Sequence, residues 1–500
     1  MAGIDPARMS GSIVPAQTIE STTVNMAKLH KKRTSFAKPA PLSTRAAIVL
    51  DIERMTPEGR GLSHYQDKPV FVEGALAGEQ VQVRLSAEHS RFAEAVTEKV
   101  LQPVELRRQP PCEYYGRCGG CSVQHMQYGL QLEIKQQAVA EQLSKLAGLK
   151  PQEWLPTLTA GEWRYRTRTH LAMLWDKQSK VLRLGFRARK DHEVVEVGHC
   201  QVLDPRLSEL LPALKALMLQ YPHKERLGHI ELVAGDEHRA LMLRLTAKAD
   251  AAWLSEMTTW CEAQQLQLWL QEGEQTQPSC HWPAPEQGGL YYTLPAFASR
   301  FDFTPADFIQ VNPALNRLMV EQAMALLAVK PGERVLDLFA GLGNFSLAAA
   351  RAGAEVIAVE GTKAMVERGN ANAQRNGLSA VQFHCADLMA DFSHQSWAGR
   401  SVDKVILDPP RAGALHAVRH VAGLKPSKIV YISCNPATLA RDAAELDQLG
   451  YRLIKAGAMD MFPQTSHVEA IALFEPYKRG GQGKKAAAGS ALARRYSGRG

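Results

Sequence analysis

Residues 335–344 read VLDLFAGLGN, an apolar run that turns at two glycines and continues into a helical pattern. Further apolar runs follow at residues 356–359, 405–407 and 429–432. Helix-like segments separate these runs, for example residues 362–376 and 436–449. Regular alternation of strands and helices predicts a parallel sheet with helices on both faces. Residues 301–476 are therefore predicted to form a Rossmann-like α/β domain.

The two glycines suit a tight turn that brings the backbone close to a ligand. Glu360 ends the next apolar run, where an acid can accept hydrogen bonds from ribose hydroxyls. The third glycine of a dinucleotide site is missing, and Asp337 at the start of the motif suits a cationic sulfonium with its ammonium group better than a phosphate. Asp387 closes a third run, where an adenine amino group can be held. The pattern predicts a site for S-adenosylmethionine, with a structural turn or another nucleotide as alternatives.

Cys434 follows the apolar run 429–432, and Asp408 follows the run before it. The carboxyl ends of strands are where open α/β sheets bind ligands. Cys434 also precedes a predicted helix, whose N-terminus favours a thiolate. An isolated cysteine is more simply interpreted as a small buried hydrophobic residue. We apply that interpretation to the remaining cysteines of the second half, Cys261, Cys280 and Cys385.

A thiolate has a specific use in the methylation of uracil. C5 of uracil is too weakly nucleophilic to attack a methyl group, but addition of a thiolate to C6 gives C5 carbanion character. A base must then remove the C5 proton so that the thiolate can leave. Glu469 begins a further apolar run, where partial burial raises the pKa of a carboxyl group, and it is the candidate base. A structural glutamate at the start of a strand is the alternative.

These motifs stand in an order that resembles the RNA uracil-C5-methyltransferases. The resemblance rests on residues 303–312, 337–344, 408–411, 433–436 and 467–469. Across residues 42–475 it extends to the bacterial members that act on 23S ribosomal RNA. It implies that Cys434 is the nucleophile and Glu469 the base. It further implies cofactor contacts from Gln310, Phe339, Asn344, Glu360, Asp387 and Asp408, although a relative of this type has asparagine at the position of Asp387.

Four cysteines form a second candidate site. They are spaced Cys112-x5-Cys118-x2-Cys121, with Cys200 farther along the chain, and three nearby glycines free the backbone to wrap around a metal. Four thiolates suit zinc or an iron–sulfur cluster, and the chemistry alone leaves both open, as well as a metal-free core. The resemblance implies a [4Fe–4S] cluster with all four cysteines as ligands. Such a cluster is expected to shape the RNA-binding surface and not to perform redox chemistry.

The first 300 residues are predicted to form two smaller domains. Residues 42–104 contain short alternating apolar runs separated by turns, which predict a small antiparallel β-barrel that resembles a TRAM domain, an OB-like RNA-binding module. Residues 105–300 are predicted to form an α+β central domain with the cysteine cluster. Within it, Ile134, Ala138, Leu143 and Leu146 are expected on one helix face that ends at Gly148.

Arginines alternate with aromatic residues at positions 163–168. On a strand, Arg164, Arg166 and Arg168 would share one face and offer charge to unpaired RNA, while Trp163 and Tyr165 would offer stacking surface. A solvated strand face is the alternative.

The net charge of +8 is concentrated at the two ends of the chain. Residues 1–38 carry six lysines and arginines against two acids, and residues 477–500 carry seven against none. Both segments are poor in aromatic residues, so we predict disordered basic tails at residues 1–41 and 477–500. Such tails attract RNA phosphates without sequence preference, or they are simply solvated ends.

The hydrophobic content of 45% suffices for several cores, and the chain is predicted to be multidomain. We find no apolar run of the roughly 20 residues that cross a membrane and no apolar signal core, which predicts a cytoplasmic protein with reduced thiols. We expect a monomer that acts on 23S ribosomal RNA. The alternatives are an enzyme for transfer RNA or another ribosomal uridine, a DNA methyltransferase, and a non-catalytic RNA-binding assembly factor, which would need neither Cys434 nor Glu469.

Overall fold

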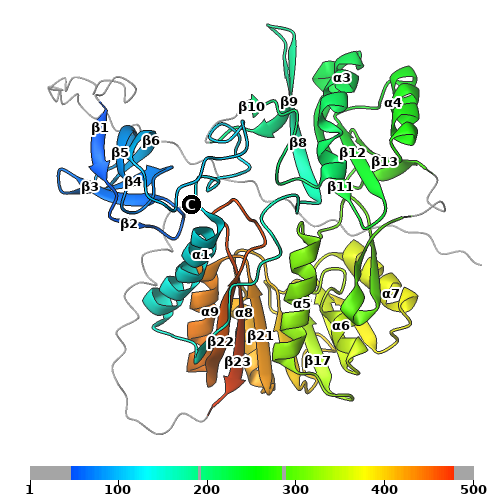
Figure 1. Cartoon of the computed structure of the whole chain (residues 1–500). Helices are drawn as coiled ribbons and strands as arrows, with labels where there is room; N and C mark the ends of the chain where they lie inside the picture. The colour runs from blue at the N-terminus through cyan, green and yellow to red at the C-terminus, as the bar shows by residue number, and fades with distance from the viewer. Residues whose placement is uncertain (1–46, 190–192, 284–288, 478–500) are drawn as a thin grey trace, which may run out of the picture. The chain divides into compact units, whose positions relative to one another are not determined.

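The structure is a computed structural model that describes residues 47–189, 193–283 and 289–477 (Figure 1). The predicted tails at residues 1–41 and 477–500 lie outside these residues, apart from Tyr477. Within the described ranges, no helix is long and apolar enough to cross a membrane. Three larger sheets and one two-stranded sheet, β15 (Leu290–Leu294) with β16 (Ser299–Phe303), make up the strands.

A six-stranded sheet forms the N-terminal region, in the order β1-β5-β6-β4-β3-β2. Its strands are β1 (Ile48–Asp51), β2 (Arg54–Met55), β3 (Gly61–Tyr65), β4 (Lys68–Glu73), β5 (Gln80–Glu88) and β6 (Ala93–Gln102). Alternate residues of β5, such as Val81 and Val83, are buried, as the apolar alternation predicts. The pair β4–β6 is parallel, so the prediction of a wholly antiparallel sheet is wrong there.

A seven-stranded sheet follows, in the order β10-β9-β8-β11-β12-β13-β14. Its strands are β8 (Arg168–Asp176), β9 (Val181–Arg187), β10 (Val194–Val195), β11 (Leu227–Ala234), β12 (Arg239–Leu245), β13 (Leu266–Glu272) and β14 (Ser279–Trp282). One face packs against α2 (Pro205–Ser208), α3 (Leu211–Gln220) and α4 (Ala251–Ala263). Short 3-10 turns lie at Lys224–Arg226 and Pro295–Phe297.

The C-terminal sheet has eight strands in the order β19-β18-β17-β20-β21-β23-β22-β7. They are β7 (Glu153–Trp154), β17 (Arg334–Leu338), β18 (Glu355–Glu360), β19 (Val381–Cys385), β20 (Lys404–Leu407), β21 (Lys428–Ser433), β22 (Tyr451–Met459) and β23 (Glu469–Pro476). The five strands from β17 to β21 are parallel, whereas β23 runs antiparallel to both neighbours. This confirms the α/β prediction.

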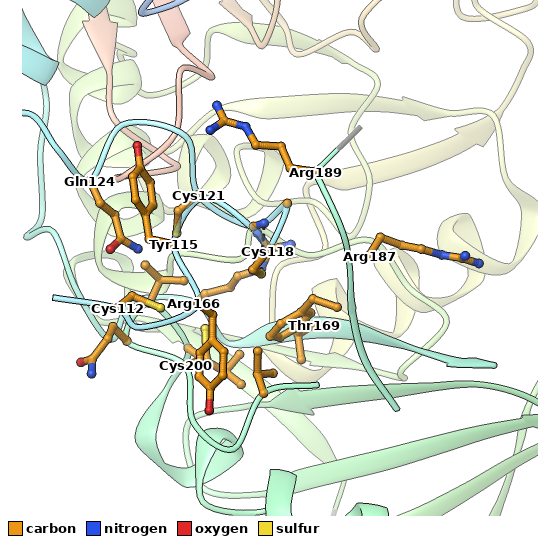
Figure 2. Close-up of a pocket in the computed structure, with 18 of the residues that line it drawn as sticks. Cys112, Tyr115, Cys118, Cys121, Gln124, Arg166, Thr169, Arg187, Arg189 and Cys200 are labelled. Carbon is orange, nitrogen blue, oxygen red and sulfur yellow. Dashed lines mark hydrogen bonds between the residues drawn. The ribbon is translucent and has the colours of Figure 1, made fainter. Parts of the chain in front are cut away.

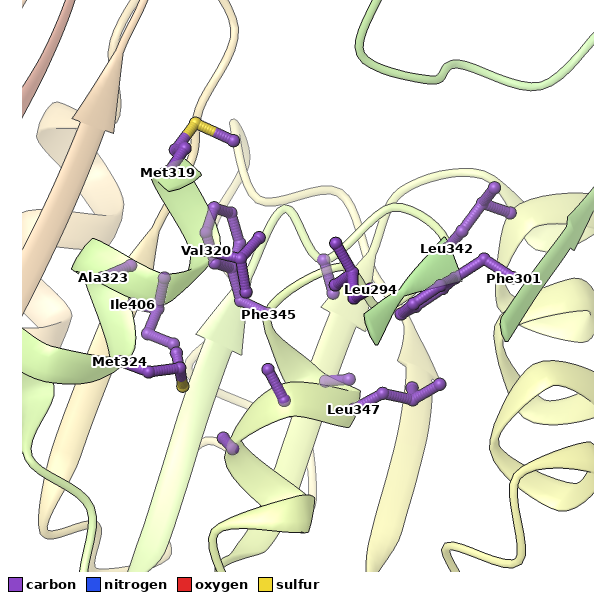
Figure 3. Packing of buried hydrophobic residues seen from close by; sticks show 14 of the residues in the cluster. Leu294, Phe301, Met319, Val320, Ala323, Met324, Leu342, Phe345, Leu347 and Ile406 are labelled. Carbon is purple, nitrogen blue, oxygen red and sulfur yellow. The ribbon is translucent and has the colours of Figure 1, made fainter. Parts of the chain in front are cut away.

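Helices cover both faces of this sheet because successive strand residues point to opposite sides. Val335 and Ile406 face α5 (Pro313–Leu327), α6 (Ser346–Arg351) and α7 (Lys363–Arg375), in the core that Figure 3 shows. Leu336 and Leu407 face the opposite core, which includes α8 (Leu415–Leu424), α9 (Pro436–Gln448) and α1 (Tyr128–Gln142). The sheet thus presents its ligand-binding edge between two closed layers.

Residues 128–154 lie in the range predicted for the central domain, yet they pack with the C-terminal sheet. Ala138 and Val139 of α1 belong to its second core, and β7 pairs in parallel with β22 at the edge. The helix continues into a π-helical turn (Leu143–Ala147) and ends at Gly148, where φ is +66°. This turn moves Leu146 off the buried face, and its side chain is exposed, contrary to the prediction.

Candidate active site

The carboxyl ends of the parallel strands surround a cavity of about 650 Å³. This volume is typical of a site for a small ligand. All eight candidate catalytic and cofactor residues line it: Gln310, Phe339, Asn344, Glu360, Asp387, Asp408, Cys434 and Glu469. The structure therefore brings together residues that are up to 159 positions apart in the sequence, from Gln310 to Glu469.

The turn after β17 is shaped by backbone conformations that favour glycine. Gly341 and Gly343 have φ values of +57° and +93°, and a Cβ at Gly343 would lie 2.7 Å from Leu347 and 2.8 Å from Phe383. Phe339 also has a positive φ, +66°, a sparsely populated conformation that clusters at functional sites. The amide of Gly341 donates a hydrogen bond to Glu360 at 3.1 Å, which fixes the turn and this side chain relative to each other.

Glu360, the last residue of β18, accepts hydrogen bonds from two backbone amides. Its second carboxylate oxygen accepts the amide of Thr362 at 3.0 Å. Each oxygen keeps a further lone pair for a ligand, as an acid that binds two ribose hydroxyls requires. On the far side, Asp387 accepts the amide of Met389 at 2.9 Å, and Met365 and Met389 line the cavity nearby.

Two residues of the glycine motif, Asp337 and Asn344, make hydrogen bonds within the protein that the sequence did not indicate. Asp337 is fully buried beneath the turn and accepts the hydroxyl of Ser346 at 2.5 Å. Burial raises the pKa of Asp337 to about 7, and its side chain supports the turn instead of meeting a ligand cation, so that prediction is wrong. Asn344 lines the cavity, but its amide exchanges two hydrogen bonds with Asn316 and accepts the hydroxyl of Tyr292.

Cys434 lies in the turn between β21 and α9. Asn435 caps α9 by accepting the amide of Ala437 and donates to the carbonyl oxygen of Arg411 at 3.1 Å, which fixes the two loops against each other. Burial, with Glu469 and Asp408 close by, raises the pKa of the Cys434 thiol, whereas Arg411 lowers it. Burial therefore opposes the thiolate that the helix terminus was predicted to favour, whereas Arg411 supports it.

Glu469 is the first residue of β23 and is only 6% exposed. Burial first, and then Asp408, raise the pKa of Glu469 to about 8, while Lys135 lowers it. Burial likewise raises the pKa of Asp408 to about 7. A buried carboxyl group that titrates near neutral pH, beside a cysteine, is suited to proton transfer.

Several lining residues were missed by the sequence interpretation. Phe308 is 65% exposed although it is aromatic and lines the cavity. Its loop is fixed by Asp307, which accepts the amide of Thr304 at 2.6 Å and pairs with Arg368, and by Arg168, which donates to two carbonyl oxygens of the loop. Arg411 and Phe462 also line the cavity. The run at residues 303–312, part of the family resemblance, was the available signal, but only Gln310 was selected from it.

The four cysteines Cys112, Cys118, Cys121 and Cys200 line a second cavity of about 550 Å³ (Figure 2). Burial raises the pKa of Cys118, Cys121 and Cys200, to about 12 for Cys121, and each is raised further by neighbouring cysteines. Buried thiols with raised pKa values release their protons only when a cation compensates the charge. The donor set therefore fits a metal centre.

The remaining cysteines differ in burial. Cys261 is fully buried on α4, which confirms its interpretation as a core residue. Cys280 is half-buried on β14. Cys385 is exposed at the end of β19, so its interpretation as a core residue is wrong.

The arginine run does not form one strand face. β8 begins only at Arg168, and Arg164 has a positive φ of +56°. Arg168 binds Glu231 at 2.7 Å, beside stacked rings of His170 and His229 whose centroids are 4.1 Å apart. Trp163 instead packs against the guanidinium of Arg108.

Comparison with known proteins agrees with this geometry. A sequence model of the family described as tRNA (Uracil-5-)-methyltransferase matches residues 127–476. The chain is 44% identical to the 23S rRNA (uracil(1939)-C(5))-methyltransferase RlmD of Pseudomonas fluorescens (strain Pf0-1), over 89% of this chain and 96% of the relative. It is 45% identical to the RlmD of Pseudomonas aeruginosa (strain UCBPP-PA14), over 85% and 93%.

A solved structure supports the fold. The tRNA (uracil-54, C5)-methyltransferase of Pyrococcus abyssi, crystallised with S-adenosyl-L-homocysteine, superposes with a TM-score of 0.66 at 24% identity. The superposition covers 85% of this chain and 99% of that one. At this identity the likeness shows a shared multidomain α/β fold.

Proposed function

Because the chain belongs to the uracil-C5 RNA methyltransferase family, we propose that it uses S-adenosylmethionine to methylate C5 of a uridine in 23S ribosomal RNA. The uridine at position 1939, named for its relatives, is the proposed target. The observation that carries the proposal is one cavity lined by Cys434, Glu469 and the glycine turn. A thiol, a buried carboxyl group and a cofactor turn are each needed for this reaction, whereas an assembly factor needs none of them.

The cofactor end of the cavity fits S-adenosylmethionine. Glu360 would hold the ribose, Asp387 with Met389 would hold the adenine, and Asp408, Gln310 and the backbone near Phe339 would hold the amino-acid part. The cofactor supplies an electrophilic methyl group when bound. Asn344, whose amide is engaged by Asn316, would support the turn that cradles it.

The reaction end fits covalent catalysis. Cys434 gives its proton to solvent, favoured by Arg411, and its sulfur forms a bond with C6 while the C5–C6 electron pair moves onto C5 and the adjoining carbonyl. After C5 has been methylated, the carboxylate of Glu469 takes the C5 proton, the double bond reforms and the C6–S bond breaks. The raised pKa of Glu469, about 8, makes it a stronger base than an ordinary glutamate.

The target base must leave its stack to reach a buried thiol. Phe308, exposed and held in a fixed loop at the cavity, offers a face on which a base can stack. Three arginines, Arg168, Arg187 and Arg244, and one acid, Glu231, surround the stacked histidine pair of the central sheet. Positive charge beside stacked rings suits RNA better than a metal cation, so we propose that this sheet face contacts RNA.

We further propose that Cys112, Cys118, Cys121 and Cys200 hold a [4Fe–4S] cluster. Zinc draws four thiolates to about 2.3 Å from one ion, so their sulfurs lie roughly 3.8 Å apart. Among the described residues, no three of these sulfurs lie within 4.8 Å of one another. The wider spacing favours a cluster with several irons over a single zinc ion. The cluster would shape the RNA-binding surface.

We also propose a domain organisation, a cellular location, an oligomeric state and a second candidate substrate. Strands β1–β6 would form the TRAM-like RNA-binding module, residues 105–127 and 155–300 the central domain, and residues 301–476 together with residues 128–154 the methyltransferase domain. The protein would be a cytoplasmic monomer. Transfer RNA is the second candidate substrate, because the family model bears its name.

The deciding experiment is to map 5-methyluridine by mass spectrometry in ribosomal and transfer RNA from cells that lack the gene. We expect the modification to vanish at position 1939 of 23S ribosomal RNA and to return with the wild-type gene but not with Cys434→Ala. Loss from a transfer RNA instead would favour the second candidate. An unchanged map would contradict both.

A further inference from the structure

The segment that leads to Glu469 is held by a helix more than 300 positions earlier in the chain. Residues 460–468 connect β22 to β23, and Phe462 in this segment lines the active-site cavity. Lys135 of α1 donates to Asp460 at 2.5 Å and to the carbonyl oxygen of Phe462 at 3.0 Å. Tyr128, at the start of the same helix, donates to the other oxygen of Asp460 at 2.9 Å.

This ion pair is completely buried, with Lys135 3% and Asp460 0% exposed. Removing two charges from water costs several kcal/mol each, and a buried pair is often no more stable than an apolar one of the same shape. Stability is thus a poor reason for a lysine and an aspartate at this place. The covalent mechanism uses neither residue directly.

The position of Lys135 and Asp460 relative to Glu469 suggests why a charged pair lies there. Met459 pairs with Glu469 across β22 and β23, so Asp460 directly follows the partner of the base. The ionisable groups that face Glu469, or that share its corner of the cavity, come from five places: Lys135 of α1, Asp408 after β20, Arg411 in the next loop, Cys434 after β21, and Asp460 with His467 in the connecting segment. Asp408 disfavours the carboxylate of Glu469, and Lys135 favours it. Burial lowers the pKa of Lys135, whereas Asp460 and Glu469 act in the opposite direction and favour its charged form.

We infer that Lys135, anchored by Asp460, is a positioning residue for Glu469, which fixes the segment before the base and keeps a positive charge beside it. The inference rests on the proposed function, in which Glu469 removes the C5 proton. Without the charge of Lys135, burial and Asp408 act on Glu469 unopposed. Glu469 would then ionise only at a higher pH than in the wild type, and the covalent adduct would resolve more slowly at neutral pH.

A double substitution separates this role from simple support of the fold. Lys135→Met with Asp460→Asn removes both charges, leaves no unpaired buried ion, and keeps an acceptor for Tyr128. Lys135→Gln is a second variant in case the double one does not fold, and Lys135→Arg is the conservative variant that retains the charge. Lys145→Met is the matched control, because this nearby lysine is exposed and bridges only Glu141.

The first measurement is the pKa of Glu469 in the protein alone. The carboxyl carbon is labelled with ¹³C, and its resonance is assigned by its absence from Glu469→Gln. In the double variant we expect the pKa of Glu469 to rise, because Lys135 is the group that lowers it, and the ionised fraction at neutral pH to fall. Lys135→Arg and Lys145→Met should titrate like the wild type.

The second measurement is the rate at which the protein–RNA adduct resolves as a function of pH in a single turnover. The midpoint should move to higher pH in the double variant, while binding of S-adenosylhomocysteine stays within twofold of the wild type. A purely structural role would lower the rate at every pH without moving the midpoint. An unchanged pKa of Glu469 in a folded variant overturns the inference.

The two readouts also distinguish this inference from the proposed function. If the wild type methylates RNA and the pKa of Glu469 does not move, the function stands and Lys135 has no such role. If the pKa moves but the wild type forms neither adduct nor product, the electrostatic role stands and the proposed reaction fails.

Discussion

The two cavities of this protein are built in opposite ways. The methyltransferase cavity is formed by strand ends, so Glu360, Asp408 and Cys434 are placed by a hydrogen-bonded sheet and two packed layers of helices. The cysteine cavity takes three of its four thiols from residues 112–121, which form turns and isolated bridges but neither a helix nor a strand. The residues of the first site are therefore placed by regular secondary structure, whereas three cysteines of the second lie in irregular backbone.

The largest effect is expected at the preformed site. Cys434→Ala should lower the rate of methyl transfer on the order of 10⁴-fold or more, because no other cysteine of the described residues lines the cavity. S-adenosylhomocysteine binding, measured by calorimetry, should stay nearly unchanged, since the glycine turn is intact. The exposed Cys385→Ala is the control and should retain full activity. Substantial turnover by Cys434→Ala would contradict the covalent mechanism.

The second-largest effect is expected for Glu469→Gln, whose turnover rate should lie about 10² to 10⁴-fold below that of the wild type. The variant should add to the uracil and transfer the methyl group but retain the C5 proton, so a protein–RNA adduct should survive denaturing electrophoresis. In the wild type, adduct resolution needs the carboxylate of Glu469, whose pKa is raised to about 8. The rate should therefore rise with pH through about 8 and be slow below it. Normal turnover without adduct would assign the base elsewhere.

Substitutions at the cysteine site should lower the stability and the metal content of the protein before they lower the rate of methyl transfer. Anaerobically purified protein should contain about four irons and four sulfides per chain. Cys112→Ser should lose the iron and lower the melting temperature, because residues 112–121 have no sheet or helix to hold them. Cys280→Ser, at a half-buried cysteine away from both cavities, is the control. One equivalent of zinc without iron or sulfide would contradict the cluster.

The same contrast explains how much the sequence could predict. Strands β17 to β21 and helices α7 and α9 follow from periodicity, and the site residues at their ends follow from motifs that are local in sequence. Leu146 was misplaced because a π-helical turn changes the angle between residues, which no apolar pattern reveals. Lys135 and Asp460 were missed because their pairing spans 325 positions. The raised pKa of Cys434 was missed because desolvation is a property of packing.

Hydrogen bonds between residues 122–123 and residues 464–466 join the two regions and provide the smallest predicted effect. The segment directly after Cys121 meets the segment before Glu469: the amides of Ser122 and Val123 donate to the carbonyl oxygen of Gln464, and the hydroxyl of Ser122 accepts the amide of Ser466 at 3.0 Å. Gln464 is fully buried with a φ of +68°, so this strained position is held by its neighbours.

Ser122→Ala removes only the hydroxyl from this contact, a loss of about 0.5–1.5 kcal/mol. If the cysteine segment helps to hold the base, adduct resolution should slow by about two- to tenfold while the iron content stays at the wild-type value. Ser144→Ala, in the exposed π-helical turn, is the matched control and should change neither quantity. An unchanged rate in Ser122→Ala would mean that the two sites work independently. A loss of iron would mean that Ser122 serves the cluster alone, and the coupling would then have to be sought through the backbone amides.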